Sequence, residues 1–550
     1  MAHSIISQAA KSPAVVYMQA YFVTIATILG TGILGLPVTL TQSGLYPFLI
    51  SFILDAVMQS ILIHFFTDLL QRAYAMQLHD PEEEAVPLSK MVEEDFSLDS
   101  EDSGDIVMKE IRIPEAQERA THFPNLHLLG KLFLPCGIQQ MFDALIILQF
   151  IALLICYALA GSEAYAQLIG TSHFYVIPVF VWLLTLGIIF AIHLIQPVVS
   201  ILTFLKGSVL LATTLVTFYV GMSVGRKINN DFTYIGAPFL MGTVALGGAI
   251  NTMPFTYEKI QYKKKQIANY RLAVHLGLWT CVVLNILWCW SVLYIVPQTI
   301  AQACAEPLFH QPSSLVAANV SSAADLSGIQ CYGKLSLQSA KLNGEISTLP
   351  LTELLTRDFP KYLWVAVLIE VFIMISITVS FLTIGSALHH TLTGVVQTVV
   401  EARGLNLGPN SSRCCAKQWL ITSIVSILAF AVVFIVAMLD PQGFVDILEK
   451  FASLTLNAQA GIFVFLMLLS ARKHRSLHIP LPLPDWAYLF MWTIPIFFGS
   501  AVLVDIYSTI RDILYPEHLV PVLMNISAPI HSSGVPVSTL ANTVQKSTVF

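Results

Sequence analysis

The strongest constraint on this chain is a series of long apolar runs, separated from one another by polar stretches. A helix needs about 20 mostly apolar residues to cross the roughly 30 Å hydrocarbon core of a bilayer. Helices suit such runs because they satisfy their own backbone N–H and C=O groups in lipid. The sequence therefore predicts an all-α polytopic membrane protein with about 11 transmembrane helices, at residues 14–40, 46–70, 139–164, 174–194, 198–220, 234–257, 272–296, 362–388, 419–439, 447–470 and 486–507.

Composition excludes a soluble fold and a nucleic-acid-binding protein. The chain is 55% hydrophobic and 11% charged, whereas soluble domains carry about 25% charged residues. The net charge is −6, but residues 80–119 hold 14 acidic and 4 basic residues, so the rest of the chain is weakly positive. No basic face remains that would bind nucleic acid.

Lysine and arginine in the loops predict the orientation, because cytoplasmic loops are enriched in both. With residues 1–13 in the cytoplasm, 17 Lys and Arg fall inside, 8 outside and 3 at or within spans. The tail 508–550 is then extracellular or lumenal. Plasma membrane and lysosome- or endosome-like membranes both remain open.

Two long loops have contrasting compositions. The outer loop 297–361 contains Cys304, Cys331 and a glycosylation sequon at Asn319, which indicates a disulfide-bonded glycoprotein; two free thiols are the alternative. The inner loop 71–135 is acidic and poor in apolar residues, which predicts disorder. It is either a solvated linker or a regulatory segment that is phosphorylated or binds a partner.

The first span is interrupted by an unusual concentration of glycine and proline. It reads Gly30-Thr31-Gly32-Ile33-Leu34-Gly35-Leu36-Pro37, although glycine costs about 1 kcal/mol and proline about 3 kcal/mol in a helix interior. Unwinding here would expose N–H groups of Gly30, Thr31 and Gly32 to a carboxylate, and carbonyl groups to a cation or an ammonium group. The alternative is close helix packing through small residues.

A second interrupted span favours the binding hypothesis. The sixth segment is also glycine-rich between Met241 and Pro254. Two interrupted spans that each begin a five-helix unit indicate an inverted-repeat transporter with its site near the membrane midplane. The repeats would be 14–222 and 234–470, with 486–507 as an eleventh helix, and the substrate-binding residues would be Gly30, Thr31, Gly32, Ile33, Gly242, Thr243, Gly247 and Gly248.

These motifs resemble those of a known family. The run from Gly30 to Pro37, followed by Ser43-Gly44, is similar to the first helix of the amino acid/auxin permease family, especially its proton-coupled amino acid transporters. Pro254-Phe255-Thr256-Tyr257-Glu258 resembles the end of the sixth helix in the sodium-coupled neutral amino acid transporters, with the tyrosine one place later. The resemblance implies a five-plus-five inverted repeat, alternating access, and a substrate between the first, third, sixth and eighth helices.

Ionisable and hydroxyl residues within the spans are candidates for ion coupling. Lys206 either snorkels toward the interface or occupies the place that sodium takes in other members of the wider superfamily. Asp55 and Glu370 could pair with polar neighbours or relay protons. Sodium coupling would instead use hydroxyls of the eighth span, where Ser376, Thr378, Ser380 and Thr383 are available.

The sequence thus favours a secondary active transporter of neutral amino acids or similar small solutes, coupled to a proton or sodium gradient. A transporter-derived nutrient sensor or scaffold without appreciable flux is the alternative. An integral-membrane enzyme is not expected, because no cluster around His389-His390 completes a metal site or an acyl-transfer dyad. No cofactor or metal is expected; the partners would be the small solute, the coupling ion and membrane lipid.

Overall fold

The computed structural model describes residues 13–30, 32–78, 125–190, 192–305, 335–402, 412–439, 447–473 and 479–514. All regular secondary structure in these ranges is helical. Nine described helices are long and apolar enough to cross a membrane, and a tenth span results if one bent pair counts as a single crossing. The predicted class, an all-α polytopic membrane protein, is confirmed, and each of the eleven predicted segments is helical.

The first five segments fold into six helices, because the first segment is split. Its halves are α2 (Pro13–Ile28) and α3 (Gly32–Ser43), which meet at an angle of 40°. The others are α4 (Leu45–Leu78), α7 (Cys136–Ile169), α8 (His173–Phe190) and α9 (Ile192–Val224).

The next five segments also begin with a split helix and end with a distorted one. The sixth segment consists of α10 (Gly236–Gly247) and α11 (Ala249–Tyr257), followed by α12 (Lys264–Ile295), α17 (Leu363–Ala402) and α18 (Ser412–Leu439). The tenth contains two π-helical stretches, η4 (Ile447–Ala452) and η5 (Gln459–Phe463), beside α20 (Ser453–Ala458) and α21 (Val464–Ala471). The last segment comprises η6 (Asp485–Trp492) and α22 (Thr493–Leu514).

Both long loops contain helices that the sequence analysis did not predict. Within 71–135, α4 continues to Leu78 and α6 spans Leu126–Phe133, while 79–124 lie outside the described residues. Asn125 caps α6, since its Oδ1 accepts a hydrogen bond from the Leu128 N–H. The acidic average of the loop conceals this short apolar helix. The loop 297–361 contains α13 (Ile300–Ala305), α15 (Leu337–Leu342) and α16 (Thr348–Asp358).

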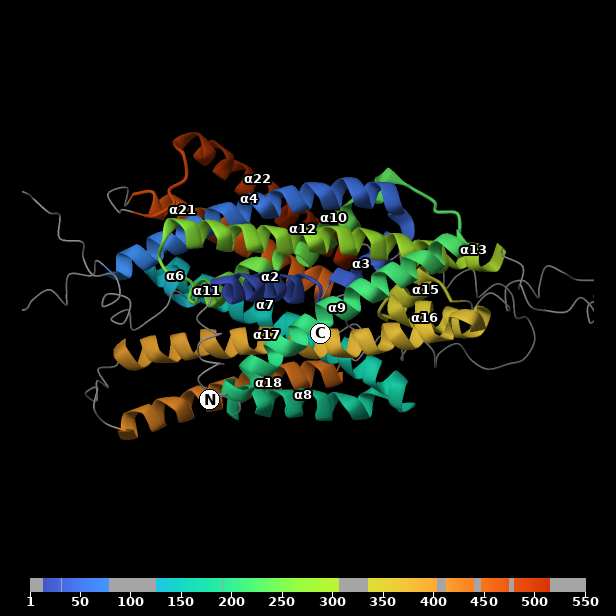
Figure 1. The fold of residues 1–550 in the computed structure, drawn as a ribbon, viewed down its shortest axis with the longest axis horizontal. Coiled ribbons are helices and arrows are strands. Elements are labelled where there is room, and N and C mark those ends of the chain that lie inside the picture. Colours follow the sequence, from blue (N-terminus) through green and yellow to red (C-terminus); the bar gives the residue numbers. More distant parts are fainter. Residues whose placement is uncertain are drawn as a thin grey trace, which may run out of the picture. The chain divides into compact units, whose positions relative to one another are not determined.

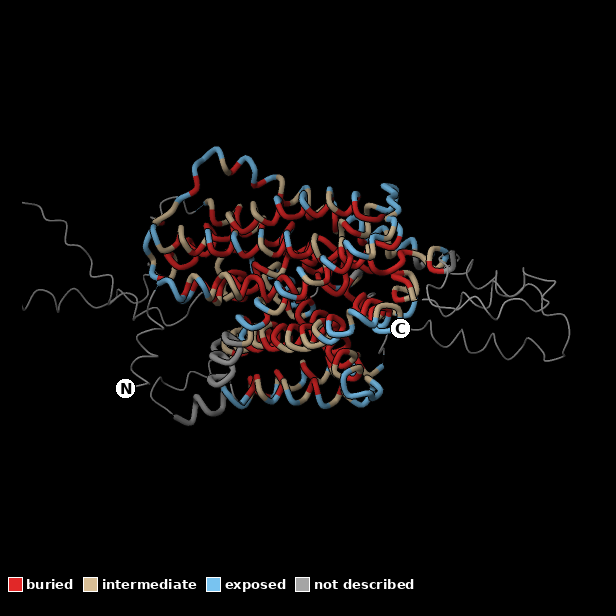
Figure 2. Tube along the Cα trace, turned by 45° about the vertical axis from the view of Figure 1, so that its right-hand side comes forward, coloured by how far each residue is buried: buried red, intermediate tan, exposed pale blue. Residues whose placement is uncertain are grey.

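The long helices run along a common direction, as α4, α12 and α17 illustrate in Figure 1. Helix α17 packs on α7 and α9, whereas α12 packs on α2, α4 and α9. In this view α13, α15 and α16 gather at the right-hand end and α6 lies at the left. Figure 2 shows buried residues on the inward helix faces and exposed residues at the periphery.

The exposed helix faces are apolar, as lipid contact requires. Leu183 on α8 is 67% exposed and Leu428 on α18 is 62% exposed. In water such patches would mark a binding surface, whereas in a membrane lipid tails cover them. By internal contacts the chain divides into two units, Met1–Leu503 and Val504–Phe550. The second unit is described as far as Leu514, where it is helical.

Candidate functional site

The interruption of the first span lies where four helices meet. A side chain at Gly30 would collide with the Tyr157 hydroxyl of α7 and would lie 2.7 Å from Ser380 Oγ of α17. A Cβ at Gly32 would lie 2.7 Å from the Cβ of Ala245 in α10 and 3.3 Å from Asn285 Oδ1 in α12. The third, sixth, seventh and eighth segments therefore converge on Gly30 and Gly32 of the first, and Thr31 lies outside the described residues.

The beginning of α3 offers N–H groups at this point. Because the helix begins at Gly32, the N–H groups of its first turn have no acceptor within the helix. The positive end of the helix dipole adds to their attraction for an anion. The sequence predicts this role for Gly30, Thr31 and Gly32, and the described first turn of α3 offers N–H groups from Gly32 and Ile33 onward. Binding of substrate by these residues stays a prediction.

Lys206 on α9 connects the end of α2 to α17. Its side chain is fully buried, and Nζ donates to the Ala26 carbonyl at 2.8 Å, to the Ser376 carbonyl at 3.2 Å and to Ser380 Oγ at 2.8 Å. Ser380 Oγ in turn donates to the Ala26 carbonyl at 3.4 Å. Lys206 therefore does not snorkel toward the interface.

The three acceptors match the charged form of lysine. An ammonium group carries three N–H donors, whereas the neutral amine carries two. All three donors have an acceptor here. Losing the proton would therefore break at least one link between α9 and the two neighbouring helices, and would leave an acceptor unpaired in the interior.

Two carbonyl groups of α3 accept hydrogen bonds from side chains of other segments. Pro37 has no N–H, so the Ile33 carbonyl four residues earlier lacks its helical donor. The Trp288 indole, fully buried in α12, donates to that carbonyl at 2.7 Å. The next carbonyl, Leu34, accepts from Ser347 Oγ at 2.8 Å. These contacts stabilise the kink and fix α3 against α12 and the segment that precedes α16.

The second interrupted span has a milder break. Gly248 separates α10 from α11, but its backbone remains right-handed, with φ −64° and ψ −19°. Glycine is required there for close approach, since a Cβ would lie 2.9 Å from Thr27 Cγ2 of α2. Gly247 instead faces Leu456 of α20. Of the two, Gly248 is thus the glycine directed toward the first span.

Two buried amides connect both halves of this span to the π-helical tenth segment. Asn457 Nδ2 donates to Thr243 Oγ1 at 2.9 Å, and Gln459 Nε2 donates to Asn251 Oδ1 at 3.0 Å. The sequence analysis missed Asn457 and Gln459. Their polarity within an apolar run was the available signal, since polar groups at membrane depth usually have a function. The π-helical turns beside them are also frequent at functional sites.

The other ion-coupling candidates are dispersed. Thr378 Oγ1 donates to the Met374 carbonyl and contacts the Tyr165 hydroxyl at 3.0 Å. Thr383 Oγ1 donates to the Val379 carbonyl within its own helix. Of the four hydroxyl residues predicted on this span, Ser380 contacts Lys206 through its hydroxyl and Ser376 through its carbonyl. Glu370 is partly exposed on α17. Asp55, on α4, is buried against the backbone of Gly242 in α10.

Asn319 and Cys331 lie outside the described residues. The sequon and the Cys304–Cys331 disulfide therefore stay predictions.

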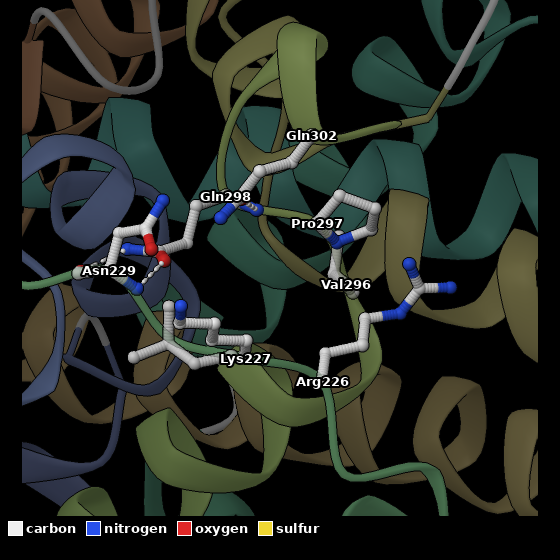
Figure 3. Close-up of a pocket in the computed structure, with 8 residues that line it drawn as sticks. Arg226, Lys227, Asn229, Val296, Pro297, Gln298 and Gln302 are labelled. Atoms are coloured by element: carbon white, nitrogen blue, oxygen red, sulfur yellow. Dashed lines mark hydrogen bonds between the residues drawn. The ribbon is translucent and has the colours of Figure 1, made fainter. Parts of the chain in front are cut away.

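A cavity of about 270 Å³ lies apart from these contacts, at the ends of α9 and α12. Arg226 and Lys227 contribute its basic groups (Figure 3). Gln298 fixes the loop beside it, accepting from the Asn229 N–H at 2.7 Å and donating to the Asn229 carbonyl at 3.0 Å. The Arg226 side chain points away from Gln298 and Asn229 (Figure 3). None of the glycines at the two interruptions lines the cavity.

Comparison with known proteins leaves the family open. No family model and no curated protein matches the chain. Among solved structures, the Eremococcus coleocola manganese transporter in complex with an aromatic bis-isothiourea compound is 13% identical, with a TM-score of 0.44, covering 92% of this chain and 87% of that one. A histidine-to-alanine mutant of the same transporter is 12% identical, with a TM-score of 0.43 and coverages of 97% and 90%.

Proposed function

We propose that this protein is a secondary active transporter of neutral amino acids or similar small solutes, driven by a proton gradient through Lys206. The observation that carries the proposal is the position of the Lys206 ammonium. It occupies a site made of a carbonyl at the end of α2, a carbonyl of α17 and the Ser380 hydroxyl. Oxygen ligands of this kind suit a small cation, and here a protein cation fills the place.

This arrangement links a proton to the interrupted span. With its proton, Lys206 links α9 to α2 and α17 through three hydrogen bonds. Without it, one bond is lost, and α2 is freer to move relative to α17. A substrate carboxylate at the N-terminus of α3 would lie next to the same interruption, so that substrate binding and proton release can affect each other.

Uptake into proteoliposomes tests the proposal. The purified protein is assayed with a panel of neutral amino acids under imposed pH gradients and, separately, sodium gradients. We expect saturable uptake that an inward proton gradient accelerates and a sodium gradient does not. Saturable binding without flux would instead identify a sensor.

The Lys206→Ala variant tests the coupling residue. We expect its residual uptake to lose its dependence on pH, because the titrating amine is gone. Lys227→Ala, at an exposed loop lysine, is the matched control and should retain the pH dependence of the wild type. Equally steep pH dependence in Lys206→Ala would remove Lys206 from the coupling role.

A further inference from the structure

Asp55 is a fully buried carboxylate on α4, and neither of its oxygens has a hydrogen-bond partner among the described residues. The carboxylate lies directly against the backbone of Gly242 in α10, where any side chain would collide with Oδ2. Phe52 contributes the apolar part of the same contact. A glycine at position 242 is thus what admits the carboxyl group to this helix interface, the α4–α10 seam.

Gln59 lies one turn further along α4 and has the same unusual environment. It is fully buried, and both its Oε1 and its Nε2 lack partners within the described part of the protein. Residues four apart lie on the same face of a helix. This face of α4 therefore presents a carboxyl group and, one turn further on, a carboxamide, each buried and without a hydrogen-bond partner among the described residues.

No charged group near this level can neutralise an ionised Asp55. The described helices α3, α10, α11 and α21, which all pack on α4, contain no charged residue. The other charged or titratable residues of α4 and of the helices packed on it are Tyr46, His64, Asp68, Arg72 and Tyr74 on α4, Tyr257 on α11, Lys264, Lys265, Tyr270, Arg271, His275, Cys281, Cys289 and Tyr294 on α12, His127 and Lys131 on α6, and Asp485 and Tyr488 on η6.

The charged groups among them pair with one another or lie far from Asp55 along the helix axes. His64 stacks on His275 at 5.8 Å between ring centroids, and Arg72 pairs with Asp68 at 2.8 Å. His64 and the exposed Tyr46, the nearest ionisable groups on α4, are each nine residues from Asp55, or about 13 Å along the axis at 1.5 Å per residue. His275 of α12 lies beside His64, and Arg271 is one helical turn before His275 on α12.

We propose that Asp55, with Gln59 beside it, is a proton-binding site at the α4–α10 seam, separate from the site at Lys206. An ionised carboxylate without a counter-charge or donor is very unfavourable in a dry interior, whereas the neutral acid is tolerated. The O–H of the neutral acid needs a hydrogen-bond acceptor. The amide oxygen of Gln59, on the same face of α4, is an acceptor without a donor among the described residues. Asp55 is therefore neutral while the seam is closed.

A movement of α10 away from α4 would hydrate Asp55 and release this proton. Gly242 precedes the Gly247–Gly248 interruption by five residues. Protonation of Asp55 would therefore depend on the position of the second interrupted span, as protonation of Lys206 depends on the position of the first. This role in a transport cycle rests on the proposed function. The protonation of Asp55 does not.

Infrared spectroscopy of the purified full-length protein tests the site without any substrate. A neutral carboxylic acid has a C=O stretch that is separate from the bands of carboxylates and amides. At neutral pH we expect a band of this kind that disappears in Asp55→Asn, a neutral replacement of nearly the same shape. Glu370→Gln, at another carboxyl within a span, is the matched control and should retain the band.

Two further measurements test the site even if the Asp55→Asn variant does not fold. If Asp55→Asn does not fold, wild-type protein labelled with ¹³C-aspartate should show the band shifted by the isotope, and Gln59→Leu should move its frequency by removing the acceptor. Absence of an aspartic acid band at neutral pH, or its full retention in folded Asp55→Asn, would overturn the proposal. Failure of the flux assays with the band present would refute transport but leave the proton site intact.

Discussion

Lys206 and Asp55 are both fully buried, but their polar environments are opposite. Lys206 has an acceptor for each of its three donors, whereas the Asp55 oxygens have no donor among the described residues. Burial of a charge is tolerable when hydrogen bonds replace its hydration, and very costly otherwise. The structure therefore accommodates a charged lysine at the first interruption and a neutral aspartic acid near the second.

Glycine 32 provides a test of the first interruption at the scale of one residue. In Gly32→Val the new side chain would overlap Ala245 Cβ, 2.7 Å from the position of the added Cβ. Overpacking costs about 1–3 kcal/mol, and the methyl groups would also cover the N–H groups that α3 presents. We expect substrate affinity to fall by roughly tenfold or more, as measured by binding to the purified protein.

Gly137→Val is the matched control, because a Cβ at Gly137 meets nothing within 4 Å. It should bind substrate like the wild type. Gly32→Val should still be expressed and inserted, since the change is confined to one helix contact. Wild-type binding and uptake by Gly32→Val would show that the interruption serves helix packing alone.

At the scale of the element, α3 shows how a proline is accommodated inside a span. Pro37 removes the donor for the Ile33 carbonyl, and Trp288 supplies a replacement from α12. Such compensation by neighbouring helices is what allows helix-breaking residues in membranes. The same bond fixes α3 relative to α12.

Replacing Trp288 with Phe should destabilise the protein. The ring would still fill most of the space, but the Ile33 carbonyl would be left without a donor, at a cost of about 1–3 kcal/mol. We expect a lower thermal midpoint for the purified protein in detergent. Trp279→Phe, on the same helix at a site 40% exposed, should leave the midpoint nearly unchanged. Equal midpoints for the two variants would argue against the indole hydrogen bond.

The elements that could be predicted from the sequence are those with a strong local signal. Apolar runs identified all eleven segments, and the glycines and prolines identified both interruptions, because backbone cost depends on residue type alone. Short helices such as α6 were missed, since eight residues have little effect on the average of a long polar loop.

The site was harder to predict, because its partners come from distant segments. Sequence reasoning identified Lys206 and Ser380 separately, but not their contact across 174 residues. It assigned equal weight to Ser380, Thr378 and Thr383, which differ only in the direction they face around α17. It left Trp288 and Gln459 out, because an isolated tryptophan or glutamine in an apolar run does not indicate which carbonyl or amide it will meet.

At the scale of the whole helical unit Met1–Leu503, the segment between α15 and α16 packs on the first interrupted span. Ser347 binds the Leu34 carbonyl through both its hydroxyl and its N–H, at 2.8 and 3.4 Å. Two residues earlier, Glu345 is partly buried, and Asn343 Nδ2 donates to it at 3.3 Å. The stability of this segment and the position of α3 are therefore connected.

Glu345 makes the stability of that connection dependent on pH. Burial, which outweighs the hydrogen bond from Asn343, raises the pKa of Glu345 above its ordinary value of 4.5, and nearby Glu353 raises it further. The folded protein therefore binds this proton more tightly than the unfolded chain does. Between the unfolded and folded pKa values, the free energy of unfolding must fall as pH rises. The contribution of Glu345 is thus fully present below the unfolded value and lost above the folded one.

Substituting Glu345 with Gln should remove this dependence, because the amide is neutral at every pH. We expect Glu345→Gln to have a higher thermal midpoint than the wild type at about pH 7 and nearly the same midpoint at about pH 4, where Glu345 is protonated in both states. The difference between the two proteins cancels the titration of all carboxyls that Glu345 does not influence. Glu353→Gln, at an exposed neighbour, should shift the midpoint less. An equal offset at both pH values would mean that Glu345 acts through packing and that its charge does not weaken the contact between this segment and α3.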